Sequence, residues 1–325
     1  MRFGILLLAL LIDRFVGDPD WLWRRFPHPV ALFGGLIDFC DKRFNREEVT
    51  PHNRVLAGLL SLSMLMVLIA VIGLALSWAL GLAGWLGLVF EAIIVSIFLA
   101  QKSLLDHVRA VITGLRDNGL IGGRRAVSMI VGRDPEMLDR PGICRATIES
   151  LAENFSDGVV APVFWYLLGG LPGLLVYKLV NTADSMIGHM SDRHRDFGRA
   201  AAQIDDVMNW PAARLSAVLI AFGTAILSGK KAGQLALVTA MRDAGLHRSP
   251  NAGWPEAAMA GGLGLVLGGP RSYGGAQVHA VCLNGTGRRN ADVRDVETAI
   301  DIASKSYGLL AIIAVGGLAI LAFLI

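Results

Sequence analysis

Long apolar runs alternate with long polar segments along this chain. Residues 55–100 contain a single charged side chain, Glu91. A membrane-spanning helix needs about 20 apolar residues, so this run is long enough for two of them. Glycines near residues 80–84 favour a tight turn there. The pattern therefore predicts a hairpin of two transmembrane helices over residues 55–79 and 83–100.

Two further apolar segments, 211–228 and 307–325, are also long enough to span a membrane. The run 3–12 is shorter, and no small-residue cleavage site precedes Asp13, so we expect a buried or interfacial helix rather than a signal peptide. These segments predict an all-α polytopic membrane protein with four to five transmembrane helices. We interpret residues 1–325 as one integral membrane domain, made of an N-terminal motif region (1–54), the transmembrane hairpin (55–100), cytoplasmic helices (101–157), an acid-rich site with membrane segments (158–228), a cytoplasmic Gly/Ala-rich region (229–306) and a C-terminal transmembrane helix (307–325).

The apolar segment 158–180 is interrupted in its middle. Pro162 lies near its start, and residues 169–173 contain three glycines and a proline. Two half-helices of about ten residues each would form a re-entrant helical hairpin, whereas one continuous helix would cross the membrane. A crossing helix would place the polar residues before and after it on opposite faces. We favour the hairpin, which would place them on one face.

The polar segments carry helix signals of their own. Residues 101–117 have apolar side chains at the spacing of one helix face, which is typical of an amphipathic helix. Asp134 followed by Pro135 is a typical helix start. Further helices are predicted over residues 141–154 and, within a segment rich in glycine and alanine, over residues 255–266.

Composition agrees with a membrane protein. Only 18% of the residues are charged and 54% are hydrophobic, whereas a soluble domain carries about 25% charged residues. The three cysteines are far apart and have no metal-ligand spacing, so neither a disulfide nor a zinc site is indicated. The basic residues are dispersed, which argues against nucleic-acid binding.

Residues 13–54 hold seven Lys and Arg and residues 101–157 hold eight, so the positive-inside rule places both segments in the cytoplasm.

An acid-rich polar block, residues 149–209, stands among these apolar segments. Carboxylates and carboxamides beside lipid are costly unless they bind something. Such oxygens, together with phosphate oxygens, are the ligands that Mg²⁺ prefers. The block therefore predicts a divalent-metal and phosphate site at a membrane face, and its members are Glu149, Glu153, Asn154, Asp157, Asn181, Asp184, Asp205, Asp206 and Asn209.

Structural explanations compete with these functional ones. Glu149 and Glu153 would also suit a solvated helix face on which Glu149 pairs with Arg145. Arg193 and Arg195 have the chemistry to hold phosphate, but they would equally pair with the acidic residues of their own loop. The residues alone leave both alternatives open.

Other candidate signals are weaker. Residues 223–231 lack the spacing of a phosphate-binding P-loop and the Ser or Thr that follows its lysine. Residues 284–289, Asn-Gly-Thr-Gly-Arg-Arg, could cradle an anion, although a flexible turn has the same composition. His28 and His189 are single histidines, and such residues more often have a structural hydrogen bond than a ligand.

An ordered set of short segments resembles one known family. The segments are Asp13-Arg14, Gly17-Asp18-Pro19, His28-Pro29-Val30, Glu149-Ser150-Leu151-Ala152-Glu153-Asn154, Ser156-Asp157-Gly158, Asn181-Thr182, Asp184-Ser185-Met186, Asp205-Asp206, Asn209-Trp210, Ala213-Arg214, Ser249-Pro250-Asn251-Ala252-Gly253, Pro255-Glu256-Ala257-Ala258-Met259-Ala260-Gly261 and Leu267-Gly268-Gly269-Pro270. Together they resemble the adenosylcobinamide-phosphate synthase family of cobalamin biosynthesis, from residue 3 to about residue 275. The chain departs from the expected pattern at His189, where an aromatic residue is usual, and at Met190, where a basic residue is frequent.

The resemblance implies a multi-pass enzyme of the cell inner (cytoplasmic) membrane, with its active site facing the cytoplasm. Such an enzyme joins the free propionate carboxylate of adenosylcobyric acid to (R)-1-amino-2-propanol O-phosphate, or to an aminopropanol or ethanolamine analogue. It consumes ATP and yields adenosylcobinamide phosphate. Mg²⁺, ATP as co-substrate and the corrinoid substrate are therefore expected ligands. The expected partners are the lipid bilayer and other late cobalamin-assembly enzymes, and no nucleic acid.

This reaction suggests roles for the polar residues. A neutral amine must attack an activated carboxylate, so a base is needed near the amine, and Asp157 or Glu153 would supply it. The Gly/Ala-rich segment 252–270 would receive the broad corrinoid face. Candidate catalytic residues are Glu149, Glu153 and Asp157, candidate metal ligands are Asp184, Asp205 and Asp206, and candidate substrate or phosphate ligands are Asn154, Asn181, His28, Arg193, Arg195, Asn251, Glu256 and Arg271.

Two other classes of function fit parts of the pattern. A magnesium-dependent membrane transferase that acts on lipid-linked phosphates or prenyl diphosphates would also place acidic motifs at the membrane face. It would need one compact aspartate-rich motif on adjacent helices, which we cannot fit to this chain. A transporter or sensor would be expected to have an even set of long spans, and the large polar loops argue against it.

Overall fold

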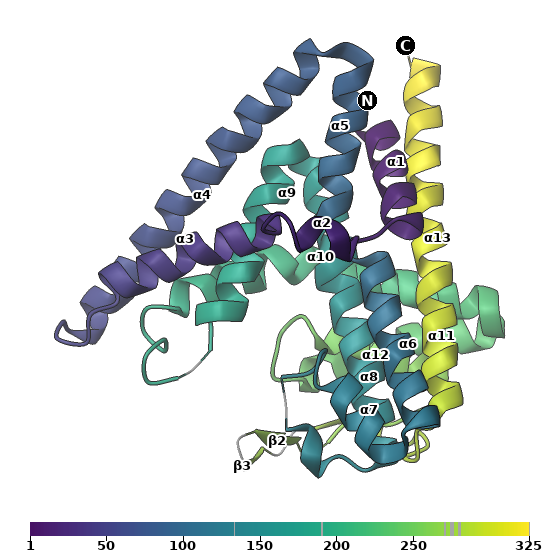
Figure 1. Cartoon of the computed structure of the whole chain (residues 1–325). Coiled ribbons are helices and arrows are strands. Elements are labelled where there is room, and N and C mark those ends of the chain that lie inside the picture. Colours follow the sequence, from purple (N-terminus) through teal and green to yellow (C-terminus); the bar gives the residue numbers. More distant parts are fainter. Residues whose placement is uncertain (133, 190, 270, 274–275, 279–280, 325) are drawn as a thin grey trace. The chain divides into compact units, whose positions relative to one another are not determined.

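The computed structural model describes residues 1–132, 134–189, 191–269, 271–273, 276–278 and 281–324, and these residues are mainly helical (Figure 1). They divide into two compact units, which are described separately. Unit 1 comprises residues 1–99, 161–209 and 318–325, and unit 2 comprises residues 100–160 and 210–317. The helices α10 (Arg199–Ser228) and α13 (Val293–Leu324) contribute residues to both units.

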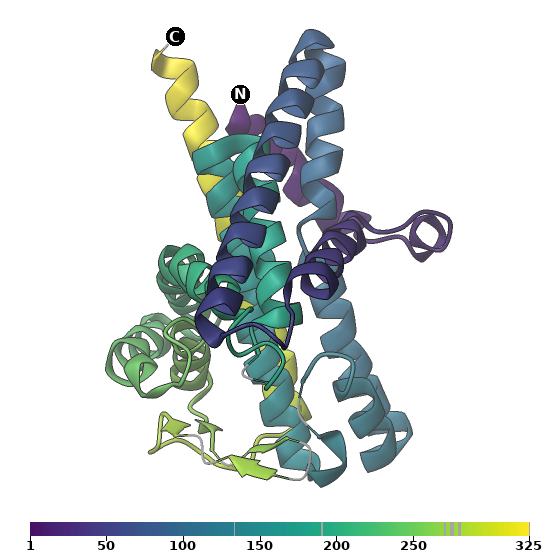
Figure 2. The same ribbon diagram turned by 90° about the vertical axis from the view of Figure 1, so that its left-hand side faces the viewer.

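Unit 1 is built around a helical hairpin. Its complete helices are α1 (Arg2–Phe15), α2 (Asp20–Trp23), α3 (Pro29–Phe44), α4 (Pro51–Leu82), α5 (Gly84–Ile97) and α9 (Ala161–Ile187). The hairpin of α4 and α5 confirms the two predicted transmembrane helices and their turn, and Figures 1 and 2 show the two helices joined at one end. Thr50 and Pro51 begin α4, where the Thr50 hydroxyl accepts a hydrogen bond from the Asn53 amide. Residues 13–54, the first of the two segments predicted to be cytoplasmic, are largely helical.

The broken segment is a hairpin, as predicted. Gly170 has φ of 65° and ψ of −154° inside α9, and a Cβ on Gly173 would lie 2.5 Å from the Trp165 carbonyl oxygen. Residues eight apart in a straight helix are separated by about 12 Å, so the chain must reverse between them. The Arg2 side chain donates hydrogen bonds to the Leu167 and Leu168 carbonyls at 3.2 and 3.0 Å. These carbonyls end the first half-helix, where carbonyl groups have no amide partner within the helix.

Unit 2 contains a bundle of shorter helices. These are α6 (Gln101–Asp117), α7 (Gly119–Val127), the 3₁₀ turn Pro135–Met137, α8 (Arg140–Phe155), α11 (Lys230–Asp243), the 3₁₀ turn Ala244–Leu246 and α12 (Gly253–Leu263). α6 and α8 confirm the helices predicted over 101–117 and 141–154, and α6 buries its apolar face. The predicted helix 255–266 begins earlier and ends at Leu263, because Gly264 takes the left-handed conformation.

Two features of unit 2 were not predicted. A π-helix, Ser156–Val160, follows α8 directly. Four short strands, β1 (Leu267–Gly268), β2 (Arg271–Tyr273), β3 (Ala276–Val278) and β4 (Cys282–Leu283), form two antiparallel pairs, β1 with β4 and β2 with β3. They leave the fold essentially all-α.

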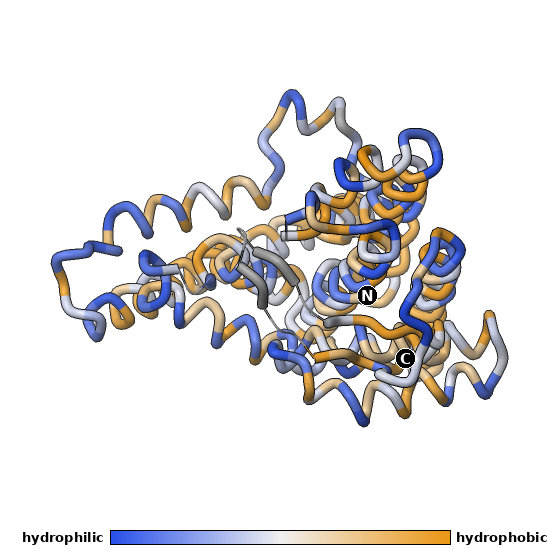
Figure 3. The backbone as a smooth tube through the Cα atoms, turned by 90° about the horizontal axis from the view of Figure 1, so that it is seen from below, coloured by the Kyte–Doolittle hydropathy of each residue, from blue (hydrophilic) through white to orange (hydrophobic). Residues whose placement is uncertain are grey.

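Five helical segments are long and apolar enough to cross a membrane, in the described part of the chain. They are residues 51–82, 84–117, 140–187, 199–228 and 293–320. The third of them contains the reversal at Gly170 and so does not run straight. Figure 3 shows hydrophobic and hydrophilic residues alternating along many helical turns, with hydrophilic residues gathered in the connecting loops. The chain is accordingly a multi-pass membrane protein.

Candidate functional site

A cluster of carboxylates and carboxamides lies in unit 1, between the second half of α9 and the first turns of α10. Asp205 is buried, with 8% of its surface exposed. Its Oδ1 accepts a hydrogen bond from the Asn181 amide at 3.4 Å, and its Oδ2 accepts one from the Asn209 amide at 2.9 Å. The predicted residues Asn181 and Asp205 therefore meet across two helices, although they are 24 positions apart.

Tyr177 fixes the orientation of this cluster. Its hydroxyl donates to the Asn209 Oδ1 at 2.9 Å in the protein interior. Because that oxygen is an acceptor, the amide NH₂ of Asn209 must face Asp205. Tyr177 carried no catalytic signal in the sequence, and only its position in the fold shows its role.

Asp184 and Asp206 complete the acidic cluster. Both are half-buried, the charge of Asp206 acts on Asp184, and the charges of both act on Asp205. A Cβ on Gly188 would lie 2.0 Å from the Asp184 Oδ1 and 2.7 Å from the Asp184 carbonyl oxygen, so a larger residue would force the backbone or this carboxylate to shift. Three like charges in a partly buried site repel one another, and a cation would relieve the repulsion.

The donor set fits Mg²⁺ bound together with phosphate better than a cage made by protein alone. Among the described residues, no three His, Cys, Asp or Glu side chains are arranged to hold a metal ion. Mg²⁺ is usually held by one or two carboxylates, substrate phosphates and waters, so such a cage is not required. Asp184 and Asp206 would hold the ion, whereas Asp205 uses both oxygens for amide hydrogen bonds and organises the cluster.

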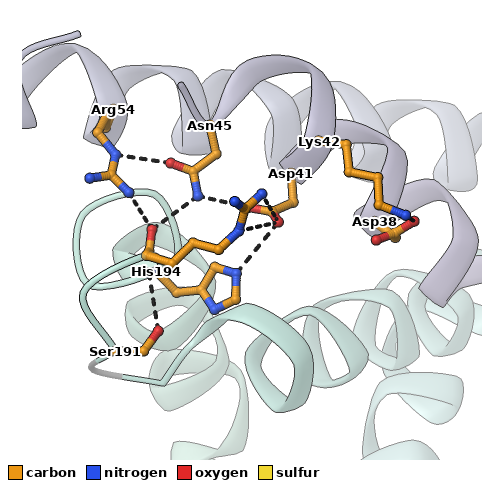
Figure 4. Close-up of polar contacts among 8 residues, drawn as sticks. Asp38, Asp41, Lys42, Asn45, Arg54, Ser191 and His194 are labelled. Carbon is orange, nitrogen blue, oxygen red and sulfur yellow. Dashed lines mark hydrogen bonds and ion pairs between the residues drawn. The ribbon is translucent and has the colours of Figure 1, made fainter. Parts of the chain in front are cut away.

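Arg193 anchors a loop in unit 1, which is the structural alternative to its predicted phosphate role. Figure 4 shows the loop after α9 held against α3 and α4. The Arg193 guanidinium donates to the Asp41 Oδ2 from Nε at 3.0 Å and from the terminal nitrogen at 2.8 Å. Asn45 donates to the Arg193 carbonyl at 3.0 Å, and Arg54 also bonds to this oxygen. Arg195 is exposed on the same loop.

Asp41 is the carboxylate that accepts the hydrogen bonds of the Arg193 side chain and so holds the loop after α9 against α3. Burial alone would raise the pKa of Asp41, but hydrogen bonds from Asn45 and Arg193 outweigh it and hold the pKa below its usual value. His194 lies 3.5 Å from the same carboxylate oxygen. Asp41 was not a predicted site residue, and the sequence separation of 152 residues from Arg193 explains why.

His28 has a structural role. It is the N-cap of α3, where its Nδ1 accepts a hydrogen bond from the Val30 amide at 3.2 Å. Its Nε2 lies 3.7 Å from Asp18, and its ring packs edge-on against Trp23 at 4.5 Å. These contacts account for the histidine between two prolines, and a role in substrate binding stays a prediction.

In unit 2, the predicted catalytic residues lie in the second half of α8 and in the π-helix that follows it. Glu149 is buried, and its Oε1 accepts a hydrogen bond from the Gly268 amide at 2.7 Å. Arg145 does not form the alternative pair with Glu149 in the described structure, but donates to the Arg289 carbonyl at 3.0 Å. Of the two alternatives that the sequence left open, the solvated helix face therefore does not apply to Glu149.

Glu153 and Asn154 are exposed, and Asp157 is half-buried in the π-helix. A π-helical turn changes the direction of its side chains relative to an α-helix and is frequent at functional sites. Asn154 donates to the Ser150 carbonyl at 2.9 Å, and it lines a hollow of about 380 Å³ together with His107. Asp157 therefore lies half-buried in an irregular helical turn, and its predicted role as a base stays a prediction.

A second polar group in unit 2 surrounds Asn251. The Asn251 Oδ1 accepts a hydrogen bond from Arg214 at 3.3 Å. The Arg214 guanidinium lies over the rings of Trp210 and Trp254, at 4.1 and 4.8 Å from their centroids. In the sequence, Trp210 and Arg214 were noted only as parts of the segments that resemble the family, and neither was a predicted site residue. Their spacing of four positions on a helix was the signal that could have predicted their contact.

Two other predicted ligands are placed in unit 2. Glu256 is buried in α12, with 1% of its surface exposed, and its Oε1 lies 3.7 Å from His247. Arg271 belongs to β2, and its side chain lies outside the described residues, as does the whole of Met190.

The carboxylates of unit 1 and those of α8 belong to different units, so whether they share a substrate stays a prediction.

Asp243 accepts a hydrogen bond from the first residue of the loop 284–289, which the sequence suggested could cradle an anion. The charge of Asp243 predicts a pH dependence of the stability of the protein. Arg242 holds the pKa of Asp243 below its usual value; burial opposes this, and the Asn284 amide, 2.7 Å away, assists. Because the folded pKa is the lower one, the stability from Asp243 is complete above about pH 5 and is lost as the pH falls through the folded pKa. We expect Asp243→Asn to lower the melting temperature at pH 7, and the gap from wild type to shrink below about pH 4.

The control for this prediction is Asp301→Asn, which removes an exposed carboxylate from α13 within the same unit. Thermal unfolding of both variants in detergent between pH 3 and pH 7 is the measurement. An equal effect of the two substitutions, or a gap for Asp243→Asn that does not change with pH, would contradict the assignment.

Comparison with known proteins agrees with this arrangement of motifs. The family model described as CobD/Cbib protein matches residues 6–303. A cobalamin biosynthesis protein CobD from Sinorhizobium sp is 57% identical over 298 residues, which cover 92% of each chain. The CobD proteins of Brucella anthropi and Rhodobacter capsulatus are 53% and 47% identical, with coverage of 95% and 88% of each chain. A search of solved structures gave no significant match.

The agreement extends over nearly the whole chain rather than over a single motif. The matched range includes both the acidic cluster of α9 and α10 and the predicted catalytic residues of α8 and the π-helix. On this ground the chain belongs to the CobD/Cbib family.

Proposed function

We propose that this protein acts in cobalamin biosynthesis as an ATP-dependent amide ligase. It would join the propionate carboxylate of adenosylcobyric acid to (R)-1-amino-2-propanol O-phosphate, or to a related amino alcohol, and release adenosylcobinamide phosphate. The observation that carries the proposal is chain-long similarity to CobD proteins, combined with an organised acidic cluster beside candidate membrane spans.

The chemistry requires activation of the carboxylate. A carboxylate is a poor electrophile, so its oxygen would first attack the terminal phosphorus of ATP and give an acyl phosphate and ADP. The neutral amine then attacks the acyl carbon, phosphate leaves, and the amine loses one proton. The protein must therefore neutralise the triphosphate, orient the carboxylate and accept that proton.

Unit 1 offers a place for the charged end of ATP. Mg²⁺ would neutralise the triphosphate when bound there. Asp184 and Asp206 would hold the ion, while Asp205 keeps the two amides of Asn181 and Asn209 in place. Arg195 is the more available phosphate ligand of its loop, because the guanidinium of Arg193 is engaged with Asp41.

Unit 2 offers the candidate base. Asp157 is half-buried and Glu153 is exposed, so either can receive a proton and pass it to water. Glu149 is less suited to this task, because it is buried and accepts the Gly268 amide. It would instead hold the turn at Gly268, in the Gly/Ala-rich segment that we propose for the corrinoid face.

The proposal places both the acidic cluster of unit 1 and the candidate bases of unit 2 on the cytoplasmic side of the membrane. This placement gives a prediction about topology. In a Cys282→Ser background, Ser128→Cys and Ser191→Cys place reporters at exposed positions before α8 and after α9. We expect an impermeant thiol reagent to label both from the cytoplasmic side, and to label Gly81→Cys, at the hairpin turn, from the opposite side. Labelling of Ser128→Cys and Ser191→Cys from opposite sides would overturn the shared face.

The activity test is a reconstituted assay with the full chain in detergent or lipid. Adenosylcobyric acid, ATP and Mg²⁺ are supplied with each candidate amine, and the corrinoid is followed by mass spectrometry. We expect a corrinoid amide and one ADP per amide. No corrinoid product, with turnover of a lipid-linked phosphate or prenyl diphosphate instead, would favour the transferase alternative.

A further inference from the structure

A hollow of about 230 Å³ lies within unit 2, beside the first turns of α8. The loop that follows β4 and the glycine turn at β1 form its other walls. Its volume is below the usual 300–1,000 Å³ of pockets for drug-sized ligands, so it fits a small molecule. Its wall includes Gly268 and Gly269, at the end of the segment proposed for the corrinoid face, but its charged residues have no role in the proposals above.

Two guanidinium groups line this hollow. Arg145 is half-buried, and one of its terminal nitrogens donates to the Arg289 carbonyl at 3.0 Å, which fixes the side chain in place. Arg289 itself is exposed. Neither guanidinium has a carboxylate within 4.0 Å in the described part of the chain, in contrast to Arg288, which pairs with Asp295. Two cations without a protein counter-ion are suited to phosphate.

The opposite charge is also present. Asp139 lines the same hollow and is exposed, although its Oδ1 already caps α8 by accepting the Gly142 amide at 2.7 Å. A carboxylate that lines the same hollow, more than 4.0 Å from the guanidiniums, disfavours a ligand that is only anionic. It favours a ligand that carries an ammonium group as well as a phosphate.

Glycine keeps the remaining wall open. Gly268 and Gly269 have φ of 81° and 87°, and a Cβ on Gly268 would lie 2.4 Å from the Val281 carbonyl oxygen. The Glu149 carboxylate holds this turn through the Gly268 amide at 2.7 Å. Backbone therefore lines this wall, and a ligand can approach it closely.

We propose that the hollow binds a small phosphomonoester that carries an amine, with Arg145 and Arg289 on the phosphate and Asp139 on the ammonium group. Within the proposed function, on which the identity of the ligand rests, this is the site of the amino-alcohol phosphate. The two guanidiniums then make the phosphorylated amine, rather than the free amino alcohol, the preferred substrate.

Cys282 provides a reporter that does not depend on turnover. It lines the hollow and is half-buried, whereas Cys40 and Cys144 are buried. A thiol reagent such as N-ethylmaleimide should therefore modify Cys282 first in the folded full-length protein. A ligand in the hollow should slow that modification.

The experiment measures the rate of Cys282 alkylation by peptide mass spectrometry, without ATP or corrinoid. The probes are 1-amino-2-propanol O-phosphate, free 1-amino-2-propanol, inorganic phosphate and ATP. We expect the phosphorylated amine to slow alkylation at a concentration at least about tenfold lower than inorganic phosphate does, and the free amine to have no effect. Equal or better protection by ATP, or no protection by any probe, would overturn the proposal.

Arg289→Gln tests the side chain directly, because its backbone carbonyl, which holds Arg145, is unchanged. We expect at least about tenfold weaker protection by the phosphorylated amine, with the same alkylation rate in the absence of ligand. The matched control is Arg294→Gln, an exposed arginine of the same unit that does not line the hollow. Equal protection in both variants would refute the role of Arg289.

This readout separates the inference from the proposed function. Protection by the phosphorylated amine in a protein that makes no corrinoid amide would support the site and overturn the ligase. Amide formation without protection would support the ligase and overturn the site.

Discussion

Replacing Asp184 with alanine should lower the rate of amide formation by at least about 100-fold, which is the usual scale for loss of one preorganised electrostatic contact. The carboxylate lies in a partly buried cluster with Asp205 and Asp206, where a bound cation would offset their repulsion. The same substitution should leave the melting temperature of the ligand-free protein unchanged or higher, because it removes one of the repelling charges. The reconstituted assay and thermal unfolding in detergent are the two measurements.

Asp192→Ala is the matched control, since Asp192 is an exposed aspartate on the loop that follows α9. It should retain nearly full activity. Near-normal turnover of Asp184→Ala would refute the metal and phosphate assignment. A large loss of stability together with activity would instead show that Asp184 supports the fold.

Replacing Gly170 with alanine should lower the free energy of unfolding by about 1–3 kcal/mol. Its φ of 65° and ψ of −154° belong to a region that side chains avoid, and a Cβ would lie 3.3 Å from the Arg2 guanidinium. That guanidinium holds the carbonyls at the end of the first half-helix, so strain at Gly170 also disturbs the cap. Thermal or denaturant unfolding in detergent measures the effect.

The neighbouring glycine supplies the control. Gly169 has ordinary backbone angles, and a Cβ there would meet nothing within 4 Å. Gly169→Ala should therefore change stability little, or raise it slightly by reducing the freedom of the unfolded chain. Equal destabilisation by both substitutions would mean that the reversal at Gly170 does not depend on its backbone conformation.

Local signals predicted the helical elements well. The apolar run with a single charge predicted the hairpin of α4 and α5, and the glycines and proline of 169–173 predicted the reversal inside α9. Such signals act within a few residues, through apolar length and backbone conformation, so they can be seen without the fold.

The side-chain partners could not be predicted in the same way. Arg193 was expected to hold phosphate, yet its partner is Asp41, which lies 152 positions away. Glu149 was open to a pairing with Arg145, yet it accepts the amide of Gly268, 119 positions away. A carboxylate has several equally suitable donors along the chain, and only packing selects one of them.

The sequence by itself determined that this is a helical, multi-pass membrane protein of the CobD/Cbib family, because apolar length and ordered motifs are properties of the chain alone. The tertiary structure decided which polar residues act together. It joined Asp205 to Asn181, Asn209 and, through Asn209, to Tyr177, and it opened a charged hollow beside α8. The physical reason is that hydrogen bonds and charges act over a few ångströms in space, whatever their separation in sequence.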